Sequence, residues 1–386
     1  MMTSDVLIAG GGPAGAALAI HAGRAGLPVS LFDGARFPRD KACGEGLMPS
    51  GVGALQRLGL AGATGGVPIG GIRYRGFGLL AETAFPPPRR EGAGEGGGPA
   101  AHGLGQRRIV FDEALWAAAR ATPNVRVFEG APVEGVVMSA GRAVGLRVAG
   151  QTVRGGLIVG ADGARSFVRR AVGLEAPRVA HPRWGLRMHF RLAPDRPPPT
   201  FVEVFVGPGH ELYLTPLPAG EVLVAVLSEH GGHQDSPVQT LRAFIDQHPA
   251  LVAHLRGAEP VSSPRGRSPL ASVARAGVAP GVVLLGDAAG FTDPLTGGGM
   301  AQALLSAELL APFLRRALTE RDDEWLWRFD RRRRALLRDY VLLTGFMVQM
   351  ARRPRLARAT LQAMRASPAM MRHLVGVAAG LRRITF

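Results

Sequence analysis

The chain opens with a short apolar run, a glycine cluster and an apolar pattern of helical spacing, in that order. Residues 5–9 are mostly Val, Leu and Ile, as in a buried strand. Between residues 16 and 24 the apolar positions recur with helical spacing, and residues 27–32 form a second strand-like run. The pattern predicts strand, tight turn, helix and strand, the start of a parallel βαβ unit.

The glycine cluster has the spacing of a dinucleotide-binding turn. Gly10, Gly12 and Gly15 fit G-x-G-x-x-G, in which the first glycine permits the turn, the second admits a pyrophosphate and the third lets the helix pack on the strand. Pro13 and Ala14 lie at the start of the helix, where free N–H groups face phosphates. We expect all five residues to contact the cofactor.

An acidic residue ends the second predicted strand. Asp33 lies 18 residues after Gly15, where a carboxylate accepts hydrogen bonds from ribose hydroxyls and repels a 2′-phosphate. The fingerprint therefore predicts a dinucleotide with an unphosphorylated ribose, either FAD or NAD.

Two later apolar runs end in a paired glycine and aspartate. Residues 157–161 lead to Asp162-Gly163, and residues 282–285 lead to Gly286-Asp287. With the amino-terminal turn, these motifs resemble the three fingerprints of the FAD-dependent oxidoreductases of the p-hydroxybenzoate hydroxylase and geranylgeranyl reductase superfamily, in the same order. The resemblance covers most of residues 1–340. It implies FAD as cofactor, with Asp162 in its site and Asp287 on the ribityl chain.

The resemblance implies further cofactor contacts. The R-x-x-F-D segment that begins at Arg108 matches one whose arginine contacts the cofactor, although the neighbouring Arg107 is an alternative. Ala131 follows a predicted strand that leads to the adenine in this family.

Near the carboxyl end of the FAD site, Gly298, Gly299 and Met300 precede an apolar helix. Their N–H groups would face the pyrimidine edge of the flavin and stabilise negative charge there.

The segment Cys43-Gly44-Glu45-Gly46-Leu47 resembles the C-G-x-G-L segment of the geranylgeranyl reductase branch, where it lies along the isoalloxazine. The resemblance implies that Cys43 and Gly44 contact FAD. Cys43 is either a residue that tunes the flavin or donates a proton, or a small thiol that packs against the ring.

The expected fold is α/β: a Rossmann-like FAD-binding domain with an inserted antiparallel β-sheet substrate domain and carboxy-terminal helices. Strands of the inserted sheet are expected at 69–78, 184–192, 201–206, 211–215 and 221–227. We assign the FAD-binding domain to residues 1–68, 102–180 and 276–330, the substrate domain to 69–101 and 181–275, and the helical region to 331–386. Residues 86–105, rich in Gly, Pro and Arg, are expected to form a mobile loop.

Candidate catalytic residues are few. Tyr213 and His189 lie on strands expected to wall the substrate cavity, and Cys43 is the third candidate. Related halogenases carry a W-x-W-x-I-P segment where this chain has Glu211–Pro216, without either tryptophan, and they use a lysine, whereas Lys41 in the flavin segment is the only lysine here. Halogenation is therefore not expected.

The net charge of +16 is concentrated near the carboxyl terminus, where residues 311–386 hold 17 Arg and six acidic residues. This basic region is either the solvated face of terminal helices or a contact with an anionic membrane surface. We expect no nucleic-acid partner. The single cysteine excludes disulfides and a cysteine-clustered metal site, and we expect no metal and a cytoplasmic protein, membrane-associated or not.

Three functions remain open. The favoured one is a monooxygenase that uses NAD(P)H and O2 to hydroxylate a hydrophobic aromatic or polyene small molecule. The first alternative is an FAD-dependent reductase of isoprenoid-type C=C bonds. The second, motivated by charge alone, is a non-catalytic flavin- or RNA-binding protein.

Overall fold

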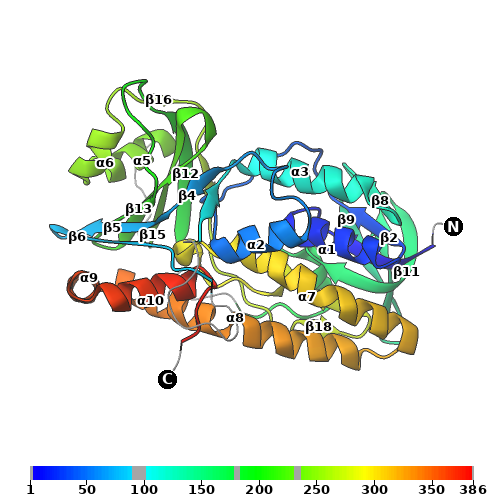
Figure 1. Cartoon of the computed structure of the whole chain (residues 1–386). Coiled ribbons are helices and arrows are strands. Elements are labelled where there is room, and N and C mark those ends of the chain that lie inside the picture. Colours follow the sequence, from blue (N-terminus) through cyan, green and yellow to red (C-terminus); the bar gives the residue numbers. More distant parts are fainter. Residues whose placement is uncertain (1–2, 89–100, 178–182, 230–235, 385–386) are drawn as a thin grey trace.

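The computed structural model describes residues 3–88, 101–177, 183–229 and 236–384. Its elements form two lobes, each built on an eight-stranded sheet, and a layer of helices runs beneath both (Figure 1).

The first lobe contains a mainly parallel sheet in the order β18 (Val278–Ala279), β19 (Val282–Leu284), β11 (Gln151–Gly160), β1 (Thr3–Ala9), β2 (Val29–Phe32) and β8 (Val125–Phe128). Strands β9 (Val133–Ser139) and β10 (Arg142–Val148) form a hairpin that pairs with the first half of β11.

The core of this lobe follows from side-chain alternation along its strands. On β1, Val6 and Ile8 face one way and pack in a cluster with helices α1 (Pro13–Arg24), α3 (Arg108–Ala121) and α7 (Gly299–Glu320). Leu7 and Ala9 face the opposite way, against the β9–β10 hairpin and α4 (Phe167–Ala171). Both faces of the sheet are therefore covered, as parallel sheets require.

The second lobe contains a sheet in the order β16 (Glu259–Pro260), β12 (Trp184–Arg191), β15 (Glu221–Ser228), β14 (His210–Pro216), β13 (Val202–Gly207), β5 (Gly71–Gly76) and β6 (Leu79–Ala84), with β17 (Arg265–Arg267) beside β12. We call it the substrate sheet. Its outer face packs on α5 (Pro237–Ile245) and α6 (Pro249–His254) through residues such as Leu212 and Leu214. Tyr213 and Thr215 alternate with them and point inward.

The helical layer joins the lobes. Helix α8 (Glu324–Ala351) packs along α7, and α9 (Pro354–Ala366) and α10 (Pro368–Ala378) pack against β6 (Figure 1). Helix α2 (Pro49–Arg57) also contacts α7, and a small sheet of β3 (Gly46–Leu47), β7 (Gly103–Gly105) and β4 (Val67–Ile69) lies where the lobes meet.

The expected α/β fold with an inserted sheet and terminal helices is confirmed. One detail was wrong: the substrate sheet is mixed, because β5 and β13 pair in parallel. These strands come from separate insertions, so no hairpin forces them to run antiparallel. The domain boundaries stay predictions. Helix α8 runs unbroken across the expected boundary at 330/331, and the boundary at 180/181 and most of the expected loop at 86–105 lie outside the described residues.

Candidate active site

The glycine turn after β1 forms one end of a long cavity between the lobes. Gly10 has φ +104°, and a Cβ there would lie 2.4 Å from the carbonyl oxygen of Ala161. A Cβ on Gly15 would lie 1.9 Å from the carbonyl oxygen of Gly10. Both positions therefore require glycine, because a side chain would clash with the neighbouring backbone. Gly12, Pro13 and Ala14 line the cavity at a helix start without a side-chain cap, which leaves N–H groups for a phosphate.

Asp33 shapes the adjoining loop. Its two carboxylate oxygens accept hydrogen bonds from the amides of Gly11 and Ala35, both at 2.8 Å, and Arg39 lies 3.7 Å away. The Ala131 amide donates to the main-chain carbonyl oxygen of Asp33 at 2.8 Å, so Ala131 lies beside the Asp33 backbone. Its contact with the adenine stays a prediction. Each carboxylate oxygen keeps a lone pair that a ribose hydroxyl can use.

A positive cluster lies deeper in the cavity, where Lys41 and Arg267 both contribute to the wall. Removal from water lowers the pKa of Lys41 and of Arg267, and the nearby Arg39 and Arg108 lower that of Lys41 further. Asp287 is the carboxylate whose field opposes both shifts, 3.8 Å from the Arg267 guanidinium. Asp287 offsets the positive charge of Lys41 and Arg267 only in part, so the cluster favours an anionic ligand, and the diphosphate of FAD fits this need.

Arg108, rather than Arg107, faces the cavity. Its guanidinium donates two hydrogen bonds of 2.7 Å to Asp112 and lies near enough to the Cys43 side chain to interact with it electrostatically. Burial opposes its charge, but Asp112 and Cys43 outweigh burial and raise the pKa of Arg108. Arg107 instead approaches Glu221 at 3.3 Å. Cys43 and Gly44 line the cavity, as expected from the sequence.

Asp162 does not line the cavity with its side chain. Its carboxylate accepts hydrogen bonds from Ser166 Oγ (2.5 Å) and from the amides of Phe167 (2.6 Å) and Val168 (3.1 Å), so it caps the start of α4. The cavity is lined instead by the next residue, Gly163, at φ +79°.

The start of α7 places Gly299 and Met300 on the cavity, together with Gly297. Gly298 faces the other way: its amide donates to the Tyr340 hydroxyl at 3.0 Å, and a Cβ there would lie 2.3 Å from the Tyr340 ring. The absence of a side chain at Gly298 therefore allows α8 to pack closely here and does not serve to make room for a ligand.

The inner face of the substrate sheet forms the opposite wall. One row of cross-strand partners runs from Tyr74 through Val204, Tyr213 and Ala225 to Arg187, and all five side chains belong to the lining. Further lining residues are apolar: Ile69, Ile72, Phe85, Leu227, Leu270, Leu295 and Ala378. This end of the cavity suits a hydrophobic substrate.

The two tyrosines of that row are neutral phenols. Burial raises the pKa of Tyr74 to about 12 and that of Tyr213 well above its usual range, with Glu211 adding to both shifts. Tyr213 donates its hydroxyl hydrogen to the Leu295 carbonyl oxygen at 3.0 Å. Both side chains can therefore position a substrate, but neither can act as a base near neutral pH.

His189 lies behind the wall, fully buried and outside the lining. Its Nε2 is 2.7 Å from Glu45 Oε2 and its Nδ1 is 2.8 Å from Ser262 Oγ. The strand of His189 was correctly predicted, and His189 lies on the same face as Arg187, which lines the cavity. Contacts with Glu45 and Arg107 bury His189 and keep it outside the lining. Within the described residues, no group of three acidic, His or Cys side chains could hold a metal ion.

Arg267 lines the cavity but was not expected there, because it comes from a short strand with no motif. Lys41 was placed in the flavin segment from the sequence without a role of its own, and it also lines the cavity.

Comparisons with known proteins agree with this geometry. The FAD binding domain family matches residues 3–343. A menaquinone reductase of Mycolicibacterium smegmatis is 33% identical over 338 residues, which is 81% of this chain and 76% of that protein. A squalene epoxidase of Aspergillus fumigatus is 30% identical, over 78% of this chain and 64% of that protein.

The fold is also shared with solved structures. A geranylgeranyl bacteriochlorophyll reductase-like protein of Thermoplasma acidophilum superposes with a TM-score of 0.72 at 24% identity, over 98% of this chain and 92% of that one. The relatives are named as enzymes, which argues against the alternative of a non-catalytic flavin- or RNA-binding protein. The chain belongs to the FAD binding domain family and is an FAD-dependent oxidoreductase of the p-hydroxybenzoate hydroxylase and geranylgeranyl reductase superfamily.

Proposed function

We propose that this flavoenzyme saturates a C=C bond of a polyprenyl compound, with NAD(P)H as the electron donor. The observation that carries the proposal is the Cys43 thiol, which lines the cavity together with the positively charged Arg108 guanidinium near it. Saturation of an alkene needs a hydride and a proton. Reduced FAD supplies the hydride when bound, and Cys43 is a proton donor in reach of the same cavity.

The proton step uses residues of this chain alone. Cys43 would give its S–H proton to one alkene carbon, and the other carbon would take the hydride that reduced FAD supplies when bound. The thiolate that remains lies beside Arg108, whose positive charge stabilises it until a proton from solvent restores the thiol.

The substrate class follows from the apolar wall formed by residues such as Ile72, Val204 and Leu227. The names of two relatives support it, because menaquinone carries a polyprenyl tail and squalene is a polyprenyl hydrocarbon.

A monooxygenase that uses NAD(P)H and O2, favoured by the sequence, is the second candidate function. Similarity to a squalene epoxidase is the observation in its favour. A single experiment separates the two functions. Purified enzyme with FAD is given NADH or NADPH and either a polyprenyl quinone or squalene, under ¹⁸O2 and under nitrogen. A product heavier by two hydrogens under both gases supports the reductase, whereas an ¹⁸O-containing product formed only under oxygen overturns it.

We also propose that the protein is cytoplasmic and contacts a membrane surface through α8. Val341, Leu342 and Phe346 are 43%, 50% and 47% exposed on this helix, and Arg334 and Arg338 are exposed one to three turns earlier. Apolar side chains beside arginines fit an anionic bilayer surface. None of the described helices is long and apolar enough to span a bilayer.

A further inference from the structure

The segment that carries Cys43 contains a residue in an unfavourable backbone conformation. Glu45 has φ +56°, in the left-handed region that a residue with a Cβ rarely adopts. A glycine would adopt this conformation freely, yet the chain has a buried glutamate here, 1% exposed, directly after Gly44. Interactions of the glutamate side chain must therefore hold the bend.

Both carboxylate oxygens of Glu45 have partners on other elements. Oε1 accepts a hydrogen bond of 2.9 Å from the amide of Arg108, the first residue of α3, where the helix dipole also favours an anion. Oε2 lies 2.7 Å from His189 Nε2 on the substrate sheet. The Glu45 carbonyl oxygen accepts from the Gln106 amide at 2.9 Å. One residue thus connects the Cys43 segment to a helix of the first lobe and to the sheet of the second.

The surroundings of His189 fix the direction of its hydrogen bond. Its Nδ1 faces guanidinium nitrogens of Arg187 at 3.1 Å and Arg107 at 3.4 Å, and a guanidinium can only donate. Nδ1 is therefore the acceptor, so Nε2 carries the hydrogen and donates it to Glu45. Ser262 Oγ, 2.8 Å from Nδ1, adds a third donor that supports the same tautomer.

We propose that Glu45 is a positioning residue for the flavin: held by His189 and the α3 amide, it fixes the left-handed bend that presents Cys43 and Gly44 to the cofactor cavity. His189, taken from the sequence as a catalytic candidate, acts through Glu45 and does not touch the ligand. The inference depends on FAD binding, not on which reaction follows.

The test measures FAD binding rather than turnover. Glu45→Ala keeps the Cβ that makes the left-handed conformation unfavourable but loses both acceptors that hold it, so we expect the dissociation constant for FAD to rise at least about tenfold and the midpoint potential of the bound flavin to shift. Glu45→Gln keeps one acceptor and should give a smaller change. His189→Ala should weaken FAD binding in the same direction, and the double variant should be no worse than Glu45→Ala, because the two residues act as one unit.

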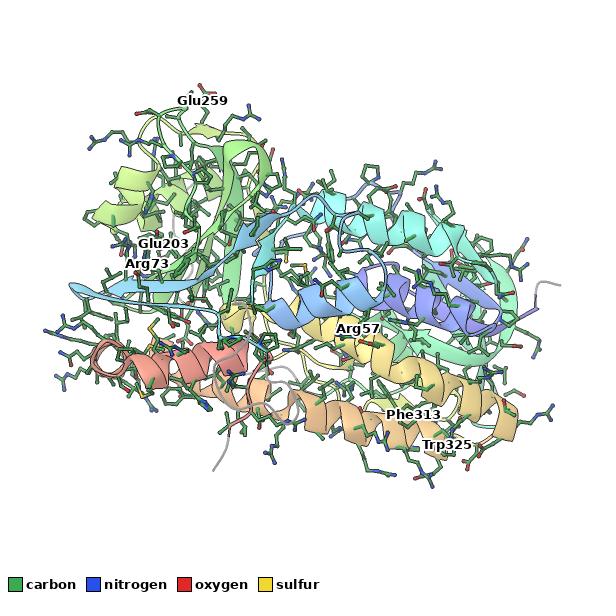
Figure 2. All side chains as sticks on the ribbon, viewed as in Figure 1. Arg57, Arg73, Glu203, Glu259, Phe313 and Trp325 are labelled. Carbon is green, nitrogen blue, oxygen red and sulfur yellow. The ribbon has the colours of Figure 1, made fainter. Side chains whose placement is uncertain are left out.

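Glu203 provides a matched control. It too is a fully buried glutamate paired with a histidine, His254 at 3.4 Å, but it lies on the outer face of the substrate sheet beside Arg73 (Figure 2). Glu203→Ala should lower the melting temperature without changing FAD affinity or potential. If Glu45→Ala or Glu45→Gln folds and binds FAD with the affinity and potential of the wild type, the proposal is wrong.

Discussion

Cys43 lies on the cavity wall, and the buried Arg108 guanidinium is near its side chain. If it is the proton donor, Cys43→Ala should lower the rate of alkene saturation by roughly 100-fold or more, the usual loss when a general acid is removed. Flavin reduction by NAD(P)H should continue at the wild-type rate, because no proton from Cys43 is needed for it. Stopped-flow absorbance and product analysis measure the two steps separately, and equal slowing of both would contradict this role.

Lys41 and Arg267 face the cavity with a single carboxylate between them. Lys41→Met should therefore raise the FAD dissociation constant about tenfold, with the loss greatest at low ionic strength. Arg256→Met, at an exposed position, is the control and should leave the constant unchanged. Fluorescence titration of the apoprotein gives both values. An unchanged constant for Lys41→Met would place the diphosphate elsewhere.

At the scale of elements, two glycines of the α7–α8 pair should respond in opposite ways to the same change. Gly298→Ala brings a Cβ to 2.3 Å from the Tyr340 ring and should destabilise the fold by roughly 1–3 kcal/mol. Gly345 lies within α8 with nothing within 4 Å of an added Cβ, so Gly345→Ala should stabilise it by about 0.5–1 kcal/mol. Thermal unfolding of both variants tests the packing of α8 on the α7 start, and two changes of the same sign would contradict it.

The buried end of β14 should make stability depend on pH. Burial raises the pKa of Glu211 to about 7, from an ordinary value of 4.5, although Arg183 opposes the shift. Since the folded value is the higher one, this carboxyl stabilises the fold below pH 4.5, and the contribution is lost as the pH rises through 7. The melting temperature of Glu211→Gln should therefore exceed that of the wild type by an amount that grows between pH 5 and 8. The corresponding difference in the free energy of unfolding should be roughly 3 kcal/mol at most.

Glu203→Gln is the control for this titration. Hydrogen bonds from His254 and Arg75 outweigh burial and hold the pKa of Glu203 at about 2, so it does not titrate between pH 5 and 8. Its difference in melting temperature from the wild type should stay constant over that range, and a constant difference for Glu211→Gln as well would refute the assignment.

The elements that the sequence predicted are those whose signal is local. The turn at Gly10 and the strand at 125–128 are encoded by residues adjacent along the chain, and both were found. Tyr74 was not assigned to the cavity, because its place beside Tyr213 depends on the parallel pairing of β5 with β13, which neither strand's own pattern reveals. The motif at Asp162 is local and was found, but the structure uses its carboxylate differently. The carboxylate accepts a hydrogen bond from the amide of Phe167, the first residue of α4, instead of facing the cavity.

At the scale of the whole molecule, the exposed apolar residues of α8 predict attachment to anionic vesicles. Wild-type protein should co-sediment with phosphatidylglycerol vesicles, and less so as salt is added. Leu342→Asp with Phe346→Asp should reduce binding about tenfold or more. Val110→Asp, at a residue 48% exposed on α3, is the control and should bind as the wild type does. Sedimentation that is equal for all three proteins would argue against α8 as the contact.

The parallel pairing of β1 with β11 and of β11 with β19 has a consequence for biosynthesis. Strand β11 is made about 150 residues after its neighbour β1, and β19 more than 100 residues after β11. Strand β1 can pair with β2 early, but its other edge has no partner until β11 has been made, and β11 in turn lacks β19 until later still. We expect a chaperone that shields apolar segments to raise the soluble yield of this protein, whatever its catalytic role.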